Sequence, residues 1–286
     1  MTAPPPSTVQ YYAPAADLAE TISTLYIARF PVAAFDEYER ADRPQIRLRL
    51  NDVAGEYHLP GGAILHAPVA TIIGPTSAPV RAISHGPVFL IGMGMMPGGW
   101  ATLMGHEAGR FANCAIDAHD LFGDWIANIA QAIAAADDDD ARIAMMQDVA
   151  REIVRHGDPA PLWFTRAVDQ WLMDNPSPQL ADLVSATRLS IRSIERMTKR
   201  FYGLPPKMLA RKYRALRAAS ALSRGETLEH ADLADAFYDQ SHLIREVKQF
   251  AGATPGKLAH PSDYTRATTA GRHLLAGRVS PLITDT

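Results

Sequence analysis

Hydrophobic side chains recur at helical spacing in two segments of the C-terminal half of this chain. Apolar residues lie three or four positions apart in both segments: Ile194, Met197 and Phe201 in one, and Leu243, Val247 and Phe250 in the other. This spacing puts them on one face of an α-helix. Ser190 and Asp239 precede the helices as N-cap residues, and Gly203 and Gly252 follow, where a left-handed residue commonly ends a helix. The pattern predicts amphipathic helices at about 190–202 and 240–251.

The two predicted helices belong to an internal repeat. Five pairs of matching residues are separated by 49 positions: Ile194/Leu243, Arg196/Arg245, Phe201/Phe250, Gly203/Gly252 and Pro206/Pro255. Residues 207–222 contain no helix breaker and predict one linking helix between the copies. A helix of about 16 residues spans ~24 Å, and adjacent major-groove turns of DNA lie ~34 Å apart. A rigid link of this length would hold two helices in neighbouring segments of the groove.

Two further helices are expected before the first of these amphipathic helices. Residues 179–186 predict a short helix, and 187–189 form a turn before the helix that starts after Ser190. A helix, a tight turn and a second helix form the geometry that lays the second helix into the major groove. Residues 161–174 predict another helix with this buried side: Trp163, Phe164, Val168, Trp171 and Leu172.

The N-terminal half has the pattern of a β-rich domain. Residues 45–50 alternate apolar and basic side chains, which is typical of a half-buried strand. Short apolar runs at 25–30, 63–66, 70–74, 80–83 and 88–93 also predict strands, separated by glycine- and proline-rich turns. Strands at this spacing favour a small sandwich or barrel. Helices are expected at about 120–135 and 141–155, with the acidic run 137–140 as a solvated loop between them.

Charge is distributed unequally between the two halves. Residues 1–159 contain 10 Lys+Arg and 19 Asp+Glu, whereas residues 160–286 contain 18 and 12. An acidic half joined to a basic half indicates that only the second half meets a polyanion such as DNA. No run of ~18 apolar residues predicts a membrane span, and the N-terminus lacks the pattern of a secretion signal. We expect a cytoplasmic, nucleoid-associated protein without a membrane partner.

The sequence lacks the motifs of common catalytic and metal sites. Its β-rich half contains histidines but no His-x-His pair of the kind that cupin barrels use for metals: His58, His66, His85, His106 and His119. Neither Gly-x-Ser-x-Gly nor His-Glu-x-x-His occurs, and Cys114 is the single cysteine. We therefore expect no catalytic residue, metal or cofactor. A cupin-type enzyme with an appended binding module is the alternative.

The C-terminal motifs resemble those of the AraC/XylS family of transcription regulators, which bind DNA through a double helix-turn-helix domain. The resemblance covers residues 161–258. Its most specific part is Tyr-Asp-Gln-Ser-His-Leu-Ile-Arg-Glu-Val-Lys over 238–248, with Gly-Ala-Thr-Pro over 252–255. The counterpart in the first copy is Ser-x-Arg-Ser-Ile-Glu-Arg over 190–196, with Gly-Leu-Pro-Pro over 203–206.

The resemblance implies a role for each exposed position of the two recognition helices. The residues expected to face bases are Arg192, Glu195 and Arg196 in one groove segment, and Gln240, Ser241 and Arg245 in the next. Arginine and glutamine can make bidentate hydrogen bonds to guanine and adenine edges. The residues expected to reach the DNA backbone are Ser193, Lys199, His242 and Lys248.

Two positions depart from the family pattern, both before the second recognition helix. Ala236 occupies a turn position where the family usually has glycine. Asp232 lies where the second unit usually buries a small apolar residue. The first helix of the second unit is therefore the element whose folding or angle we expect to differ.

The N-terminal half resembles more loosely the small cupin-like domain that accompanies some members of the family. The features are a Gly-Pro-Thr turn at 74–76, the strand end Gly-Met-Gly-Met-Met-Pro-Gly-Gly at 92–99, and residues 113–123. In the family such domains bind effectors or dimerise. Met93, Met95 and Trp100 are candidate effector-pocket residues, although filling the core is the commoner role of such side chains.

Together these patterns predict a two-domain protein. We expect a disordered segment at 1–10, a β-rich sensor or dimerisation domain with trailing helices at 11–159, a double helix-turn-helix domain at 160–262, and a flexible tail at 263–286. The expected partners are double-stranded DNA, a small-molecule effector, a second copy in a homodimer and, for an activator, RNA polymerase. A partner-binding protein whose helix-turn-helix units no longer read DNA is a further alternative.

Overall fold

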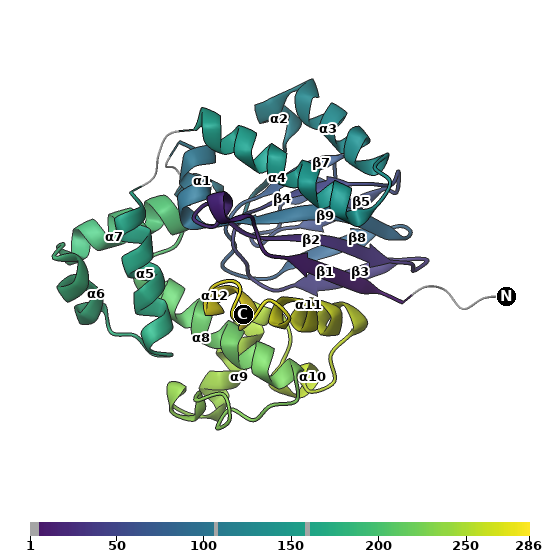
Figure 1. Cartoon of the computed structure of the whole chain (residues 1–286). Helices are drawn as coiled ribbons and strands as arrows, with labels where there is room; N and C mark the ends of the chain where they lie inside the picture. The colour runs from purple at the N-terminus through teal and green to yellow at the C-terminus, as the bar shows by residue number, and fades with distance from the viewer. Residues whose placement is uncertain (1–5, 106–107, 158–160) are drawn as a thin grey trace.

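The computed structural model describes residues 6–105, 108–157 and 161–286. In this part of the chain an antiparallel β-domain is followed by a helical region (Figure 1). The six-stranded sheet has the order β1 (Thr8–Tyr12), β2 (Ile22–Phe30), β9 (Val88–Met95), β4 (Gln45–Arg49), β7 (Ala70–Ile73) and β10 (Ala115–Asp117). The four-stranded sheet has the order β3 (Phe35–Glu39), β8 (Val80–Ser84), β5 (Gly55–His58) and β6 (Ile64–His66).

The six-stranded sheet separates two hydrophobic cores. Along β2, Leu25 and Ile27 face a core shared with α3 (Asp124–Ala134) and α4 (Asp139–His156). The alternate residues Tyr26 and Phe30 face the other core, which contains residues of the four-stranded sheet. Successive side chains of a strand point to opposite faces, so this sheet is apolar on both sides and packs between the helices and the second sheet. Two packed sheets followed by helices confirm the predicted fold class.

Strand β4 corrects the prediction of a half-buried strand. Its apolar side chains Ile46 and Leu48 are buried in the core next to the helices, as expected. The basic side chain of Arg47, on the opposite face, is also buried, and its guanidinium forms a bidentate ion pair with Glu39 at 2.7 and 2.8 Å. The predicted alternation of apolar and basic side chains is confirmed, but the basic face of the strand points between the sheets and not into solvent.

The helices of the N-terminal domain begin with α1 (Pro97–Leu103). The helix expected over 120–135 is divided at Gly123, whose φ of 58° separates α2 (His119–Phe122) from α3. The acidic run 137–140 is not merely a solvated loop. Asp138 caps α4 by accepting a hydrogen bond from the Ala141 backbone nitrogen, and Asp139 forms an ion pair with Arg29.

The predicted helices of the C-terminal half are confirmed. They are α5 (Leu162–Asp174), α6 (Leu180–Thr187), α7 (Ile191–Tyr202), α8 (Pro206–Ser223) and α9 (Gln240–Ala251). The short α10 (Pro255–Leu258), which was not predicted, follows them. Phe164 and Leu172 on α5 are buried as expected. Trp163 is not: it is 53% exposed, so its assignment to the buried side was wrong. No described helix is long and apolar enough to cross a membrane.

Both ends of the chain are more ordered than the sequence predicted. Within the stretch 1–10, expected to be disordered, residues from Thr8 onwards form β1, and residues 1–5 lie outside the described part. The expected flexible tail folds into α11 (Asp263–His273) and α12 (Pro281–Thr284). Helix α11 lies along β1 (Figure 1). Leu282 of α12 is buried in the core of the helical region.

Candidate DNA-binding surface and effector cavity

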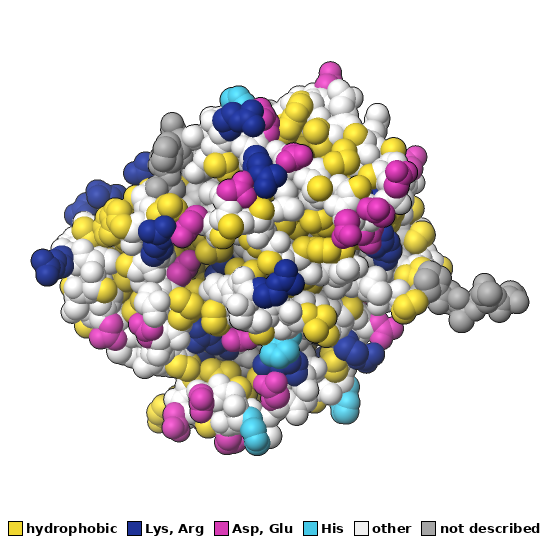
Figure 2. Space-filling view, viewed as in Figure 1, with side chains coloured by type: hydrophobic (Ala, Val, Ile, Leu, Met, Phe, Trp, Pro, Cys, Tyr) yellow, Lys and Arg dark blue, Asp and Glu magenta, His cyan; other side chains and the backbone are white. Residues whose placement is uncertain are grey.

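Helix α7 presents a polar face on an apolar base. The Ser190 hydroxyl accepts a hydrogen bond from the backbone nitrogen of Ser193 at 3.2 Å, and Gly203 ends the helix with φ of 74°. Ile194 and Phe201 are buried in the core formed with α5. The side chains of Arg192, Glu195, Arg196 and Lys199 are exposed, and Lys and Arg side chains gather at the edge of the molecule where α7 lies (Figure 2).

Helix α9 is built in the same way. The Asp239 carboxylate accepts a hydrogen bond from the His242 backbone nitrogen at 2.7 Å, and Gly252 ends the helix with φ of 77°. Val247 and Phe250 are completely buried. The exposed side chains on the opposite face are Gln240, Ser241, Arg245 and Lys248.

The repeat in the sequence is therefore a repeat in the structure. Helices α7 and α9 each contain 12 residues, and both of their ends are displaced by the 49 positions that separate the matching residues. Within the described residues, no hydrogen bond or ion pair engages the side chains expected to face bases on either helix, which include Arg196, Gln240 and Arg245. These side chains are available to a ligand outside the chain.

Two of the residues assigned to the DNA backbone have partners within the protein. His242 Nδ1 lies 3.3 Å from the Tyr238 backbone nitrogen, and its Nε2 lies 3.3 Å from a Glu246 carboxylate oxygen. The Ser193 hydroxyl lies 3.0 Å from the Ser190 hydroxyl. Both side chains help to position the first turn of their helix, whereas Lys199 and Lys248 project from the surface.

A buried ion-pair cluster behind α9 was not foreseen from the sequence. The Glu246 carboxylate, 2% exposed, accepts hydrogen bonds from Arg211 at 2.7 Å and from Arg214 at 2.6 Å, both on α8. Burial alone would raise the pKa of Glu246, but the two guanidinium groups lower it below its usual value. The repeat offered a signal for this cluster. Glu246 matches Met197 in the first copy, a partly buried apolar residue, so a buried carboxylate could have been expected at this position.

The first helix of the second unit is not regular. The counterpart of α6 would cover residues 229–236, but this segment consists of turns followed by the short 3-10 helix η3 (Ala234–Ala236). Asp232 has a φ of 53°, which is incompatible with an α-helix. The expectation that this element would differ is confirmed, and Asp232 lies at the break.

Two recognition helices with free polar faces, carried on one linking helix, define the C-terminal region as a double helix-turn-helix DNA-binding domain. Residues 183–260 match the sequence model of a helix-turn-helix domain family, which is of the AraC type. The C-terminal region thus contains a helix-turn-helix DNA-binding domain of the AraC type, as the motifs predicted. A search of curated proteins finds no match.

Solved structures of ToxT from Vibrio cholerae resemble the chain weakly. The apo form of a ToxT variant is 8% identical, with coverage of 82% of this chain and 97% of that one and a TM-score of 0.49. ToxT bound to an unsaturated fatty acid is 9% identical, with coverage of 91% and 97% and a TM-score of 0.45. Similarity at this level transfers neither a ligand nor a residue role to this chain.

A cavity of about 500 Å³ lies between the two sheets and extends under the C-terminal segment. Its walls include Tyr26 and Phe30 of β2 and Tyr57 of β5, and α11 contributes Tyr264 and Thr268. This volume is in the range of small-molecule sites. The alternating pattern of the strands decides which residues reach it, because only one face of each strand points between the sheets.

The prediction that Met93, Met95 and Trp100 line an effector pocket is wrong. All three side chains are completely buried in the core between the six-stranded sheet and the helices, and none lines the cavity. Met93 and Met95 lie on the helix-facing side of β9, opposite the cavity. They fill the core, which is the commoner role of such side chains.

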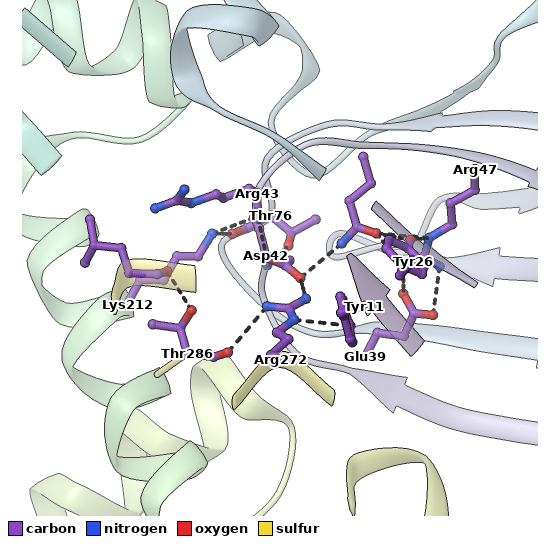
Figure 3. A network of polar contacts seen from close by, with 12 residues as sticks. Tyr11, Tyr26, Glu39, Asp42, Arg43, Arg47, Thr76, Lys212, Arg272 and Thr286 are labelled. Atoms are coloured by element: carbon purple, nitrogen blue, oxygen red, sulfur yellow. Dashed lines mark hydrogen bonds and ion pairs between the residues drawn. The ribbon is translucent and has the colours of Figure 1, made fainter. Parts of the chain in front are cut away.

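A polar cluster joins the β-domain, the linking helix and the C-terminal segment (Figure 3). The Asp42 carboxylate forms an ion pair with Arg272 of α11. Lys212 of α8 donates hydrogen bonds to the backbone oxygens of Asp42 at 2.6 Å and Thr76 at 2.8 Å. Burial lowers the pKa of Lys212 to about 7. Asp42 and Arg272 also line the cavity, so the cluster connects the cavity with the helix that carries both DNA-binding units.

Proposed function

We propose that the protein is a non-enzymatic, sequence-specific transcription regulator that reads DNA with α7 and α9. The observation that carries this proposal is the duplicated recognition helix. Its apolar side is buried, and the side chains expected to face bases are exposed and have no partner in the described structure. A helix surface retained only for solubility has no reason to repeat arginine at matching positions, as Arg196 and Arg245 do.

Each recognition helix is assigned to one segment of the major groove. We infer that Arg192, Glu195 and Arg196 contact bases in one segment, and Gln240, Ser241 and Arg245 in the next. Lys199 and Lys248 would contact phosphates, which adds affinity without sequence preference. We also assign His242 and Ser193 to contacts with the DNA backbone. The reason is their position in the first turn of a recognition helix.

The β-domain is proposed to sense a small molecule in its central cavity. The support is the volume of about 500 Å³ together with the shared residues Asp42 and Arg272, which link the cavity to α8. Homodimerisation, contact with RNA polymerase and a cytoplasmic location at the nucleoid follow as parts of the same proposal. They rest on the regulatory role alone.

Selection of bound duplexes from a random DNA pool, at two salt concentrations, tests the DNA-binding proposal. We expect a bipartite motif with its halves about one helical turn apart, because two recognition helices on one linker read neighbouring groove segments. Binding without an enriched sequence, lost at moderate salt, would indicate electrostatic attachment alone and contradict the proposal.

A further inference from the structure

Two groups of aromatic side chains form part of the cavity walls. Tyr11 and Tyr26 pack together with ring centroids 5.3 Å apart, and Phe30, Phe35 and Tyr264 form a second group with centroids 5.1 to 5.7 Å apart. All five line the cavity, and one of them comes from α11. Such walls favour a ligand with a flat apolar body, because ring faces and edges pack well against it.

Most charged groups around the cavity are paired with each other. Arg47 is paired with Glu39, and Arg272 with Asp42. Arg49 donates to the backbone oxygens of Val53 and Ala67. The two ion pairs are satisfied within the protein. Arg49 makes both of its hydrogen bonds through Nη1, and its Nε is buried without a partner among the described residues.

Arg40 is different. It lines the cavity, and its Nε and Nη2 atoms are buried without a hydrogen-bond partner among the described residues. Burial, together with the nearby charge of Arg272, lowers the pKa of Arg40 to about 10. Buried polar groups are rarely left unpaired, and an unpaired cation is costly to bury. Asp42 attracts the Arg40 guanidinium electrostatically, but its carboxylate is ion-paired with Arg272, so Arg40 has no anion hydrogen-bonded to it among the described residues.

A second polar group without a partner lies on α11. The hydroxyl of Thr268 is buried and has no hydrogen-bond partner among the described residues, and Thr268 also lines the cavity. Glu37 also lines the cavity and pairs with no cation among the described residues. Its carboxylate accepts a hydrogen bond from Ser262, and burial raises its pKa.

We propose that the cavity binds an aromatic monocarboxylate, with its ring system among the tyrosine and phenylalanine side chains and its carboxylate at Arg40. The carboxylate would accept charge-assisted hydrogen bonds from the guanidinium, which presents several donors in one plane. The regulatory role of this ligand rests on the proposed sensing function of the β-domain. Binding itself is a property of the cavity and is testable without DNA.

The position of the site also indicates what the ligand would do. Arg40 lies close to Arg272, and the two positive charges repel each other in the unliganded cavity. A carboxylate between the β-domain and α11 would offset this repulsion and strengthen the attachment of α11. The ligand would therefore stabilise the arrangement in which α8 and α11 are docked on the β-domain.

Titration calorimetry on the full chain, with matched probes, tests the proposal. The probes are 2-naphthoate and biphenyl-4-carboxylate, their neutral carboxamides, and acetate as a carboxylate without a ring system. We expect at least one aromatic acid to bind about tenfold more tightly than its own carboxamide, as one good charge-assisted hydrogen bond provides. Acetate should bind far more weakly than that acid. Equal binding of acid and amide, or no binding of either acid, would overturn the proposal.

Substitutions separate a direct contact from a general effect on folding. Arg40→Met should abolish the preference for acid over amide, while the unliganded protein melts at the same temperature or higher because an unpaired buried charge is removed. Arg40→Lys keeps the charge and should retain part of the preference. Arg266→Met, on the exposed side of α11, is the matched control and should bind as the wild type does. A full preference for the acid in Arg40→Met would contradict the role of Arg40.

The DNA-binding proposal and the carboxylate-site proposal can be rejected independently, because they are tested by separate experiments. An enriched operator without any probe binding would leave the DNA-binding proposal intact and reject the carboxylate site. Probe binding that depends on Arg40, without an enriched operator, would support the site and reject sequence-specific DNA recognition.

Discussion

The two DNA-binding units share a recognition helix of the same length but are stabilised in different ways. In the first unit, a regular helix α6 precedes α7, and the inner side of α7 is apolar. In the second unit, turns and a 3-10 helix precede α9, and a buried carboxylate on α9 binds two arginines of α8. The first unit is held by hydrophobic packing and by hydrogen bonds from the Tyr202 hydroxyl to α5, whereas the second is held in part by ion pairs.

The difference shows which features a recognition helix needs. Both helices keep their N-cap, their left-handed C-terminal glycine and their buried aromatic residue, Phe201 or Phe250. The element before the helix and the contact behind it have changed, and the ends of the helix have not. We infer that the second unit depends more on pH and on the linking helix than the first unit does.

The largest expected effect comes from removing the carboxylate behind α9. Glu246→Ala should cost about 3 kcal/mol in the free energy of unfolding, because breaking a buried ion pair leaves Arg214 uncompensated. Arg211 is 41% exposed and can return to water, which keeps the cost at the lower end of the range. Chemical denaturation would measure the change, and hydrogen exchange should show that α9 loses protection.

Met197→Ala, at the matching position of the first unit, is the control for Glu246. Its cost should not change with acid pH. The contribution of Glu246 should be present above its ordinary pKa of 4.5 and disappear as the pH falls through the lowered pKa of the folded state. The same pH profile for both variants would show that ion pairing does not distinguish the units.

A second comparison concerns base reading by the two helices. Arg196→Ala and Arg245→Ala should each cost about 1–3 kcal/mol in binding at one base position, in different halves of the operator. Competition binding with operators mutated one base pair at a time would locate both positions. Lys199→Ala should weaken all sequences about equally and reduce the salt dependence of binding. Sequence-independent losses from all three variants would contradict the assigned roles.

Lys212 on the linking helix should make the stability of the protein change with pH in the alkaline range. The pKa of Lys212 is about 7 in the folded protein and 10.5 in its ordinary state. Between these values the unfolded chain binds the proton more strongly, so the stability contribution of this lysine rises with pH. Relative to Lys212→Met, the wild type should gain up to about 1.4 kcal/mol per pH unit between pH ~7 and ~10.

Denaturation of both proteins at several pH values would measure this difference. Lys207→Met, which removes an exposed lysine of the same helix, should show the same pH dependence as the wild type. A constant difference between wild type and Lys212→Met would contradict the lowered pKa.

The smallest expected effect lies at the irregular segment. Asp232 and Arg188 have φ values of 53° and 55°, in the second and the first unit respectively. Glycine adopts this region without the steric cost of a side chain. Asp232→Gly should stabilise the protein by about 0.5 kcal/mol and Arg188→Gly by about 1 kcal/mol, because aspartate tolerates the region better than arginine. Calorimetric melting would measure both, and destabilisation would show that these side chains make compensating contacts.

Local sequence signals determined the recognition helices. The period of apolar residues, a capping residue and a glycine act within one helix and its first flanking residues, so α7 and α9 could be bounded without knowledge of their neighbours. The repeat added the position of the linking helix. The weak point of the second unit, near Asp232, was indicated by its departure from the family pattern and not by these local signals.

Only the tertiary structure decided which faces of the other elements are buried and what they meet. The sequence showed the alternation along β4 and the apolar run of β9. It did not show that Arg47 faces a partner carboxylate between the sheets or that Met93 and Met95 face helices. The tail packs against the rest of the chain through contacts such as the ion pair between Arg272 and Asp42, which are 230 positions apart in the sequence. Local periodicity specifies that a strand or helix has two faces. Which face becomes a core, a cavity wall or a DNA-binding surface depends on contacts between residues far apart in the chain.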